Sequence, residues 1–523
     1  MGKKLGEFIT EDNLDFALAH ITSYYDTDFF PRTDEFFAIC HKWEEVKKYI
    51  LESDIEGIFA ATPMTEPWPK TKGGYRVVHR LEPIDCLIYT AFAKAVSNKV
   101  EASRASPEVA CAYRLTDSYD RFFGDGSGFE VFRERCEALS NTHEFVLCTD
   151  IADFYNKIYL HRLQNALELA ASKEIASAVE NFLSLLNTKA SQGIPVGPAA
   201  SIVMSEVTLN DVDKFLYTRG VEYVRYVDDF RIFGRTKEYL EKILQDLVIY
   251  LHETQRLSLN SSKTYILNSS DYIEQELNNQ YAQEKIKIFG DLDGVGIYSM
   301  HSSAEDDFSD DQEEDIEDVG DVLFESLSKM LNYESLDLGL IRAIVRRAKA
   351  HKSDSIFDLL IERLDFVLPA INDVILYFDS LSDDEFLEGR AEVFSSIVSS
   401  SVMNIRVARL WFEWYFSRHQ ILLKNSTIRN FIFGGESLRS QAIAAISTKN
   451  EAWIKERKGR LQHYVLWDRR SIILAASVLS KDERDKWLKP LLKGNSLSHL
   501  DRWMIQWVLD GSSRNLDCLD IPF

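Results

Sequence analysis

Apolar residues in the C-terminal part of the chain recur at the three-to-four-residue spacing of amphipathic helices, from about residue 322 to residue 511. Similar helical segments succeed one another with gaps of 32, 32, 33, 31 and 32 residues. A unit of that length holds one helical hairpin, which must stack on its neighbours to bury its apolar face. We therefore predict an all-α domain of HEAT-like solenoid repeats over 326–523. The segments begin near Ile341, Asp373, Ile405, Leu438, Arg469 and Asp501.

The N-terminal part contains short apolar runs that are typical of strands. The run FVLCTDI, 145–151, predicts a buried strand that ends at Asp150. The run EYVRYVDDFRIFG, 222–234, predicts a hairpin whose tight turn carries Asp228 and Asp229. Together with helical segments between them, these runs indicate an α/β domain over 1–300.

A strongly acidic run separates the two parts. Glu305 to Asp321 carries 11 acidic residues and no basic one, so it accounts for 11 of the net charge of −23 and leaves −12. Such a run repels itself and cannot bury a core. We expect a solvated linker over 301–325. The alternative is an acidic mimic that competes with nucleic acid for a basic surface.

Composition places the chain among ordinary folded proteins. It has 523 residues, of which 45 % are hydrophobic and 12 % aromatic. No apolar run approaches the roughly 18 residues that a membrane span needs, and the N-terminus does not resemble a secretory signal. The 6 cysteines are scattered without any C-x-x-C pair, a pattern typical of reduced thiols. We expect a cytoplasmic protein with no membrane partner.

The adjacent carboxylates of Asp228 and Asp229 need a cation to offset their repulsion and desolvation. Asp150, delivered at the end of a neighbouring strand, supplies a third carboxylate. This is a ligand set for two Mg²⁺ ions, with Mn²⁺ as a substitute, since hard cations prefer carboxylate oxygens. The predicted metal site comprises Asp150, Ile151, Asp228 and Asp229, whereas Asp153 is expected to face solvent or cap the following helix.

The order of these segments resembles that of reverse transcriptases. Asp150 resembles the catalytic aspartate of their first palm motif, and YVDD, 226–229, resembles their signature hairpin. Between them SQGIPVGPAAS, 191–201, resembles the Q-G-x-P-x-G segment ahead of a palm helix. The resemblance covers about residues 20–270 and implies a palm-and-fingers fold that transfers deoxynucleotides.

The resemblance also implies roles for single residues. Tyr155 matches the ring that collides with a ribose 2′-hydroxyl, which implies a preference for deoxynucleotides. Lys263, in LSLNSSKTYI, matches the catalytic lysine that can protonate the leaving pyrophosphate, although a merely solvated lysine is the alternative. The segment WPKTKGGYRVVHR resembles the fingers hairpin that holds the triphosphate. The implied nucleotide-binding residues are Arg76, Lys70, Lys72, Tyr155, Gln192 and Gly193.

The region after the palm departs from ordinary reverse transcriptases, because no basic helical thumb is evident after Lys263. A palm that precedes a large helical domain resembles the bacterial abortive-infection (Abi) polymerases of phage defence. DTDFFPRTDEF, 26–36, also resembles an N-terminal segment of that group. This likeness implies a homo-oligomer that makes single-stranded DNA without a template.

In that group DNA synthesis starts from a tyrosine hydroxyl of the protein, so the DNA ends up covalently attached. A tethered primer replaces the affinity that a basic thumb would give. The candidates for the priming residue are Tyr24 and Tyr25, and Tyr415 or Tyr464 of the helical domain stays open.

Two other functions remain open on the sequence alone. One is a template-directed reverse transcriptase that uses a structured RNA. The other is a non-catalytic interaction protein, whose helical repeats bind a phage factor while the palm serves as a nucleotide-binding switch. DNA synthesis in the absence of added nucleic acid would distinguish the template-independent polymerase from both of these alternatives.

Overall fold

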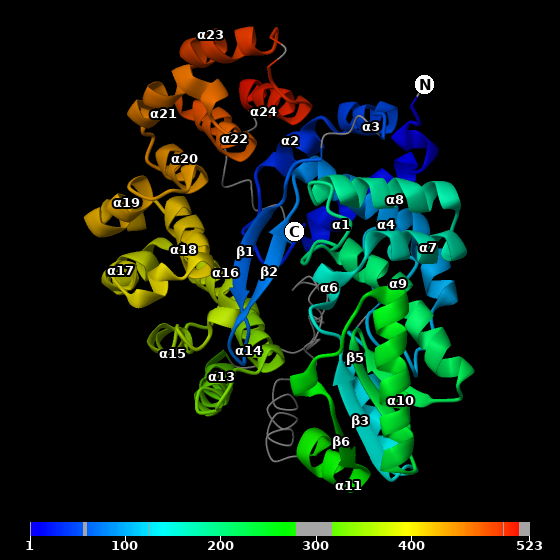
Figure 1. Cartoon of the computed structure of the whole chain (residues 1–523). Helices are drawn as coiled ribbons and strands as arrows, with labels where there is room; N and C mark the ends of the chain where they lie inside the picture. The colour runs from blue at the N-terminus through cyan, green and yellow to red at the C-terminus, as the bar shows by residue number, and fades with distance from the viewer. Residues whose placement is uncertain (1, 56–59, 125, 279–315, 495, 512–523) are drawn as a thin grey trace. The chain divides into compact units, whose positions relative to one another are not determined.

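The computed structural model describes residues 2–55, 60–124, 126–278, 316–494 and 496–511. The chain divides into two compact units (Figure 1). The first holds the described residues within 1–27, 47–65 and 77–310, and the second those within 28–46, 66–76 and 311–523. Two segments from the N-terminal half therefore belong to the second unit.

The first unit is built on an antiparallel sheet with the strand order β4–β5–β3–β6. Its strands are β3 (Phe145–Asp150), β4 (Glu222–Tyr226), β5 (Asp229–Gly234) and β6 (Tyr265–Asn268). Leu147 of the central strand lies opposite Ile232 of β5 and Ile266 of β6. The strand at 145–150 and the hairpin at 222–234 that the sequence predicts are thus neighbours in one sheet.

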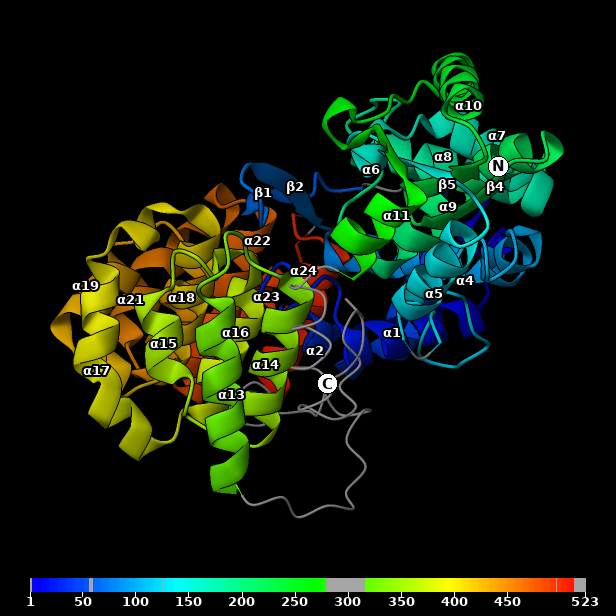
Figure 2. The same cartoon turned by 90° about the horizontal axis from the view of Figure 1, so that it is seen from below.

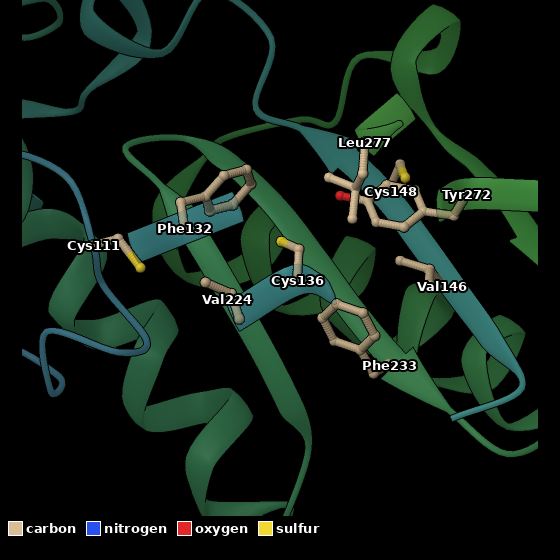
Figure 3. Close-up of a cluster of buried hydrophobic side chains, with 9 residues drawn as sticks. All are labelled: Cys111, Phe132, Cys136, Val146, Cys148, Val224, Phe233, Tyr272 and Leu277. Atoms are coloured by element: carbon tan, nitrogen blue, oxygen red, sulfur yellow. The ribbon is translucent and has the colours of Figure 1, made fainter. Parts of the chain in front are cut away.

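One face of the sheet carries Val146, Cys148 and Phe233. On this face α5 (Phe129–Ser140) and the segment 269–277 complete a buried apolar cluster, which Figure 3 shows between the strands and the covering residues. Burial raises the pKa of the Cys136 and Cys148 thiols to about 12. These thiols are therefore protonated packing groups.

The opposite face is covered by α10 (Lys237–Tyr250), while α9 (Ala199–Thr218) packs against β4. A Cβ added to Gly234 would lie only 2.9 Å from the Leu240 side chain. Because Gly234 shares this face with Ile232, the close approach fixes α10 against β5. The sheet is consequently buried between helices on both sides.

Further helices surround the sheet. A capping box at Thr10, whose side chain accepts from the Asn13 amide, starts α1. Pro83 in the first turn and the Glu82 carboxylate, which accepts from Ile84 N–H, start α4. The other elements here are η1 (Leu5–Glu7), α1 (Glu11–Tyr24), α3 (Trp43–Glu52), α4 (Pro83–Ser103), α6 (Phe154–Lys157), α7 (Leu160–Ala170), α8 (Lys173–Leu186), η2 (Leu251–Gln255), η3 (Ser261–Lys263), α11 (Ser269–Tyr272) and η4 (Ile273–Leu277).

A separate hairpin pairs β1 (Met64–Pro69) with β2 (Tyr75–Arg80). Gly73 and Gly74 form its turn with φ of 87° and 77°, values that glycine adopts without strain. The turn is closed by a hydrogen bond from Lys70 N–H to the Gly74 carbonyl at 3.0 Å. Residues 66–76 of this hairpin belong to the second unit.

The second unit is helical in its described residues outside that hairpin, which confirms the all-α prediction for the C-terminal region. The helices succeed one another in chain order from α13 to α24 (Figure 2). Together with α2 (Glu35–His41) from the N-terminal half, the helices of this unit are α13 (Ile316–Met330), α14 (Leu338–Ala350), α15 (Phe357–Glu362), η5 (Leu368–Ala370), α16 (Ile371–Leu381), α17 (Asp384–Val398), η6 (Ser401–Asn404), α18 (Arg406–Arg418), η7 (Leu422–Lys424), α19 (Ser426–Phe433), α20 (Leu438–Ser447), α21 (Glu451–Arg457), η8 (Lys458–His463), α22 (Leu466–Ala475), η9 (Ala476–Val478), α23 (Lys481–Leu491) and α24 (His499–Asp510).

Alternate helices of this unit pack on one another in succession, from α14 through α16, α18, α20 and α22 to α24. Buried ion pairs join some of the neighbours. Arg342 Nε lies 3.1 Å from Asp373 Oδ2, and Arg470 Nε lies 3.2 Å from Asp501 Oδ1. Both pairs are 31 residues apart in the chain. That the helices form HEAT-like repeats stays a prediction.

The acidic run lies outside the described residues up to 315, and α13 begins within it at Ile316. Over the parts of the chain that the structure describes, none of the helices has the length and apolar character needed to cross a bilayer.

Candidate active site

The two adjacent aspartates lie at the tip of the β4–β5 hairpin, as the sequence predicts. Asp228 comes after Val227 in the two-residue turn, and Asp229 opens β5 opposite Tyr226. Val227 has a φ of 54°, a left-handed conformation that costs a β-branched residue on the order of 1–3 kcal/mol. The turn is therefore held in a strained form by its surroundings.

Asp150 lies beside this hairpin. It is paired directly with Asp229 across the β3–β5 ladder, so both side chains leave the same face of the sheet. The amide of Ile151 donates to the Asp228 carbonyl at 3.1 Å. Three carboxylates separated by up to 79 residues of sequence thus come from directly neighbouring backbone positions.

Lys263 contacts the first of these carboxylates. Its Nζ lies 2.7 Å from Asp150 Oδ2, and the lysine side chain is 60 % exposed. Asn260 adds a hydrogen bond from its backbone N–H to the Asp150 carbonyl at 2.8 Å. The segment around η3 therefore fixes the end of β3 and brings an ammonium group to the site.

Arg231 holds the second carboxylate and was not predicted. Its guanidinium contacts Asp229 through Nη1–Oδ1 and, at 3.3 Å, Nη2–Oδ2. Burial acts to lower the pKa of Arg231, but attraction to Asp229 raises it well above its usual value. The sequence could have indicated this contact, because Arg231 stands two residues after Asp229 in a predicted strand and so lies on the same face.

The donor set fits a divalent metal ion in its chemistry. Carboxylate oxygens are the ligands that Mg²⁺ prefers, and the Asp229 side chain is 38 % exposed. No three acidic, histidine or cysteine side chains within the described residues are grouped closely enough to hold a metal. Instead, Lys263 pairs with Asp150 and Arg231 pairs with Asp229. A metal ion could bind these carboxylates only if it replaced the two cationic side chains.

The loop that contains the predicted nucleotide-binding residues Gln192 and Gly193 packs against the turn after β3. Gln192 Nε2 donates to the Lys157 carbonyl at 3.1 Å, and the Gly193 amide donates to the Ile158 carbonyl at 2.8 Å. The next amide, that of Ile194, donates to the Tyr155 carbonyl at 2.9 Å. The structure therefore brings Tyr155, Gln192 and Gly193 together.

The same loop is pinned to β2. His79 and Val196 exchange two hydrogen bonds, from His79 N–H to the Val196 carbonyl at 2.8 Å and from Val196 N–H to His79 Nδ1 at 3.0 Å. Gly197 comes next with a φ of 133°, and a Cβ there would lie 2.5 Å from Thr27 Oγ1. Only glycine fits this position, which holds the start of α9.

Asp153 is exposed and has a φ of 51° at the start of α6. Its Oδ1 accepts from Asn156 Nδ2 at 2.8 Å. This agrees with the expectation that Asp153 faces solvent rather than the other carboxylates.

Arg225 is a second residue that sequence reasoning missed. It is fully buried, and its Nη2 lies 2.8 Å from both Glu206 Oε2 and Asp213 Oδ2. Its Nη1 also donates to the Val227 carbonyl at 3.3 Å. Burial acts to lower the pKa of Arg225, but Asp213 and Glu206 raise it well above its usual value. The charged guanidinium therefore supports the strained turn from beneath.

The three predicted cationic contacts lie on the β1–β2 hairpin. Lys70, Lys72 and Arg76 are exposed and belong to the second unit. Their role in binding a triphosphate stays a prediction.

The candidate priming residues differ in exposure. Tyr24 is buried and Tyr25 half-buried at the end of α1. Tyr415 is fully buried, with its hydroxyl 2.7 Å from Ser382 Oγ, and Tyr464 is half-buried. Priming by any of these tyrosines stays a prediction.

Several solved structures of telomerase are similar to the chain. Telomerase from Candida albicans, in complex with a TWJ fragment of telomeric RNA, is 13 % identical, with a TM-score of 0.31 and coverage of 72 % of this chain and 70 % of that chain. Apo telomerase from Candida tropicalis is 12 % identical, with a TM-score of 0.33 and coverage of 68 % of each chain. No curated protein matches the chain significantly.

A family model identifies the domain. The model described as reverse transcriptase (RNA-dependent DNA polymerase) matches residues 68–290. That span contains Asp150, the Q-G-x-P-x-G loop, the YVDD hairpin and Lys263. Residues 68–290 of this chain are therefore a reverse transcriptase domain.

Proposed function

We propose that the chain is a cytoplasmic, Mg²⁺-dependent DNA polymerase. It joins deoxynucleotides without a template and starts the DNA strand on the hydroxyl of one of its own tyrosines. In this proposal it acts in abortive-infection defence against phages, as a homo-oligomer. The observation that carries the polymerase function is the cross-strand pairing of Asp150 with Asp229 beside Asp228, inside a reverse transcriptase domain.

The residues of the site take separate roles in this proposal. Asp150, Asp228 and Asp229, with the backbone of Ile151, would hold the metal. When bound, divalent ions there would supply activation of the attacking hydroxyl and offset charge on the leaving pyrophosphate. Lys263 Nζ, released from Asp150, would donate a proton to that pyrophosphate.

The template-independent part of the proposal rests on charge and on the resemblance to the Abi polymerases. The chain keeps a net charge of −12 even without its acidic run, whereas binding a duplex calls for a basic footprint. A tethered primer needs no such footprint because it is held by a covalent bond. The helical unit after the palm agrees with the same resemblance.

The alternative favoured by the family description is RNA-templated DNA synthesis. One experiment separates the possibilities: purified protein is incubated with Mg²⁺ and labelled deoxynucleotides, with and without added RNA. We expect label that stays with the protein after phenol extraction when no nucleic acid is added. Label only on adding RNA would support the templated enzyme, and no label in either case would favour an interaction protein.

The matched control is the double variant Asp228→Asn, Asp229→Asn. It keeps the size of both side chains but removes the anionic ligands, so incorporation should fall by about 10³-fold or more. Circular dichroism should remain unchanged because both positions lie at the hairpin tip. Full incorporation by a folded double variant would rule out the metal assignment.

A further inference from the structure

The tip of the β1–β2 hairpin is built into the helical unit through one of its faces. Trp68 of β1 is 5 % exposed, and its Nε1 donates to the Pro369 carbonyl at 3.0 Å. The Trp68 ring packs edge-on against Phe29, with centroids 5.0 Å apart. Phe29 in turn accepts a hydrogen bond at its carbonyl from Trp411 Nε1 of α18 at 3.2 Å.

An ion pair adds a second anchor. Glu66 Oε1 lies 2.8 Å from Arg406 Nη2, at the first position of α18. The Glu66 side chain is 15 % exposed, whereas that of Arg406 is 67 % exposed. Because one partner is largely desolvated, we expect this pair to hold the hairpin more firmly than a fully exposed pair would.

The tip that follows these anchors is exposed to solvent and cationic. Lys70, Lys72 and Arg76 are exposed within seven residues of sequence, together with Tyr75, which is 58 % exposed. Three cations and an aromatic ring on a short, tightly turned hairpin suit a ligand that carries both phosphates and a base. The incoming nucleoside triphosphate has this chemistry.

We infer that the helical unit sets the nucleotide affinity of the enzyme by holding this hairpin. Glu66 and Trp68 are positioning residues: they fix the tip against α18 and the Pro369 turn so that residues 70–76 meet the triphosphate in one orientation. The inference rests on the proposed function in so far as it takes a deoxynucleoside triphosphate as the ligand. It assigns the helical unit a part in substrate binding.

The test is a charge reversal and its rescue. Arg406→Glu places two carboxylates against each other, so the tip should loosen, and the dissociation constant for labelled dATP in Mg²⁺ should rise about threefold to tenfold. Hydrogen exchange at the Lys70 and Gly73 amides, which are bonded within the turn, should accelerate. The double variant Glu66→Arg, Arg406→Glu restores the opposite charges and should restore both readouts.

The matched control is Lys424→Glu, which reverses a charge opposite Glu388 elsewhere in the helical unit, where both side chains are 67 % exposed. It should change neither readout. Trp68→Phe keeps a packing ring but removes the donor to Pro369, and should weaken dATP binding in the same direction. Normal dATP affinity in Arg406→Glu, or failure of the double variant to rescue it, would overturn the inference.

Binding and exchange are both measured without synthesis. A wild-type protein that binds dATP but incorporates none would therefore count against the proposed polymerase alone. A wild-type protein that binds no dATP would overturn this inference as well.

Discussion

Tyr155 is the residue at which sugar selectivity is expected. Its carbonyl is held by the Ile194 amide at 2.9 Å, and its half-buried ring packs edge-on against Phe154, with centroids 5.6 Å apart. In the proposed function, a bulky ring fixed in this way would exclude a 2′-hydroxyl by contact. Tyr155→Ala should therefore lower the preference for deoxynucleotides over ribonucleotides by about 10²-fold.

The measurement is kcat/KM for paired deoxy- and ribonucleotides. Tyr155→Phe, which keeps the ring, serves as the control and should retain the preference. Unchanged selectivity in Tyr155→Ala would remove Tyr155 from this role.

The three carboxylates could be located from the sequence because local patterns specify them. A strand-terminal aspartate and a two-residue hairpin each have a recognisable signature. Arg231 and Arg225 were missed although each lies within the predicted hairpin. The carboxylate partners of Arg225 are Glu206 and Asp213 of α9, which no local pattern in the hairpin contains. Arg231 and its partner Asp229 stand two residues apart in one strand, so that pair could have been found from the alternation of the strand.

Among the helices, α1 carries a group that should make stability depend on pH. His20 is buried, and its Nδ1 donates to the Asp120 carbonyl at 2.9 Å. Burial lowers the pKa of His20 from 6.5 to about 4. Between these values the unfolded chain binds a proton that the folded chain does not, so stability falls as the pH drops from about 6.5 towards 4.

The full loss is on the order of 3 kcal/mol. In urea unfolding between pH 6.5 and 4.5, His20→Gln should reduce this dependence, because glutamine does not titrate yet can still donate to the carbonyl. His161→Gln changes a histidine whose side chain is 59 % exposed and should leave the slope as in wild type. Equal slopes for His20→Gln and wild type would contradict the expectation.

Between helices, Asp373 of α16 joins Arg342 and Arg346 of α14 at 3.1 and 3.0 Å, with only 6 % of its side chain exposed. Removing one partner of a buried pair leaves an uncompensated charge and costs about 3–5 kcal/mol. We expect Asp373→Ala to lower the thermal midpoint of the protein by several degrees.

Asp358→Ala is the matched variant for this measurement. It breaks the pair with Arg390 at 3.3 Å, in which the Asp358 side chain is 68 % exposed. A midpoint within about a degree of wild type is expected. Equal losses in the two variants would mean that the α14–α16 pair contributes no more than a surface contact.

At the scale of the whole molecule, the sequence predicts the boundary between the α/β part and the helical part of the chain. It does not predict which segments each unit contains. The helical spacing and the acidic run are local features. The assignment of residues 28–46 and 66–76 to the helical unit depends on contacts such as Trp68–Pro369, which joins residues 301 positions apart. No periodicity in the N-terminal half points to that partner.

This interleaving leads to a prediction about truncation. A chain of residues 1–300 leaves Phe29, Ile39 and Trp68, each no more than 5 % exposed in the full chain, without the helices that cover them. We expect the fragment to be insoluble or to bind a hydrophobic dye strongly. Co-expression of residues 301–523 should restore solubility, and a soluble fragment that binds no dye would contradict the prediction.

The bond between Phe29 and Trp411 spans 382 residues. At about 5–20 residues per second, a ribosome needs on the order of 20–80 seconds after making the first partner before it makes the second. Throughout that interval the aromatic side chains of the N-terminal segment have no docking surface. Residues 28–46, although made early, therefore belong to the last part of the chain to reach the native state.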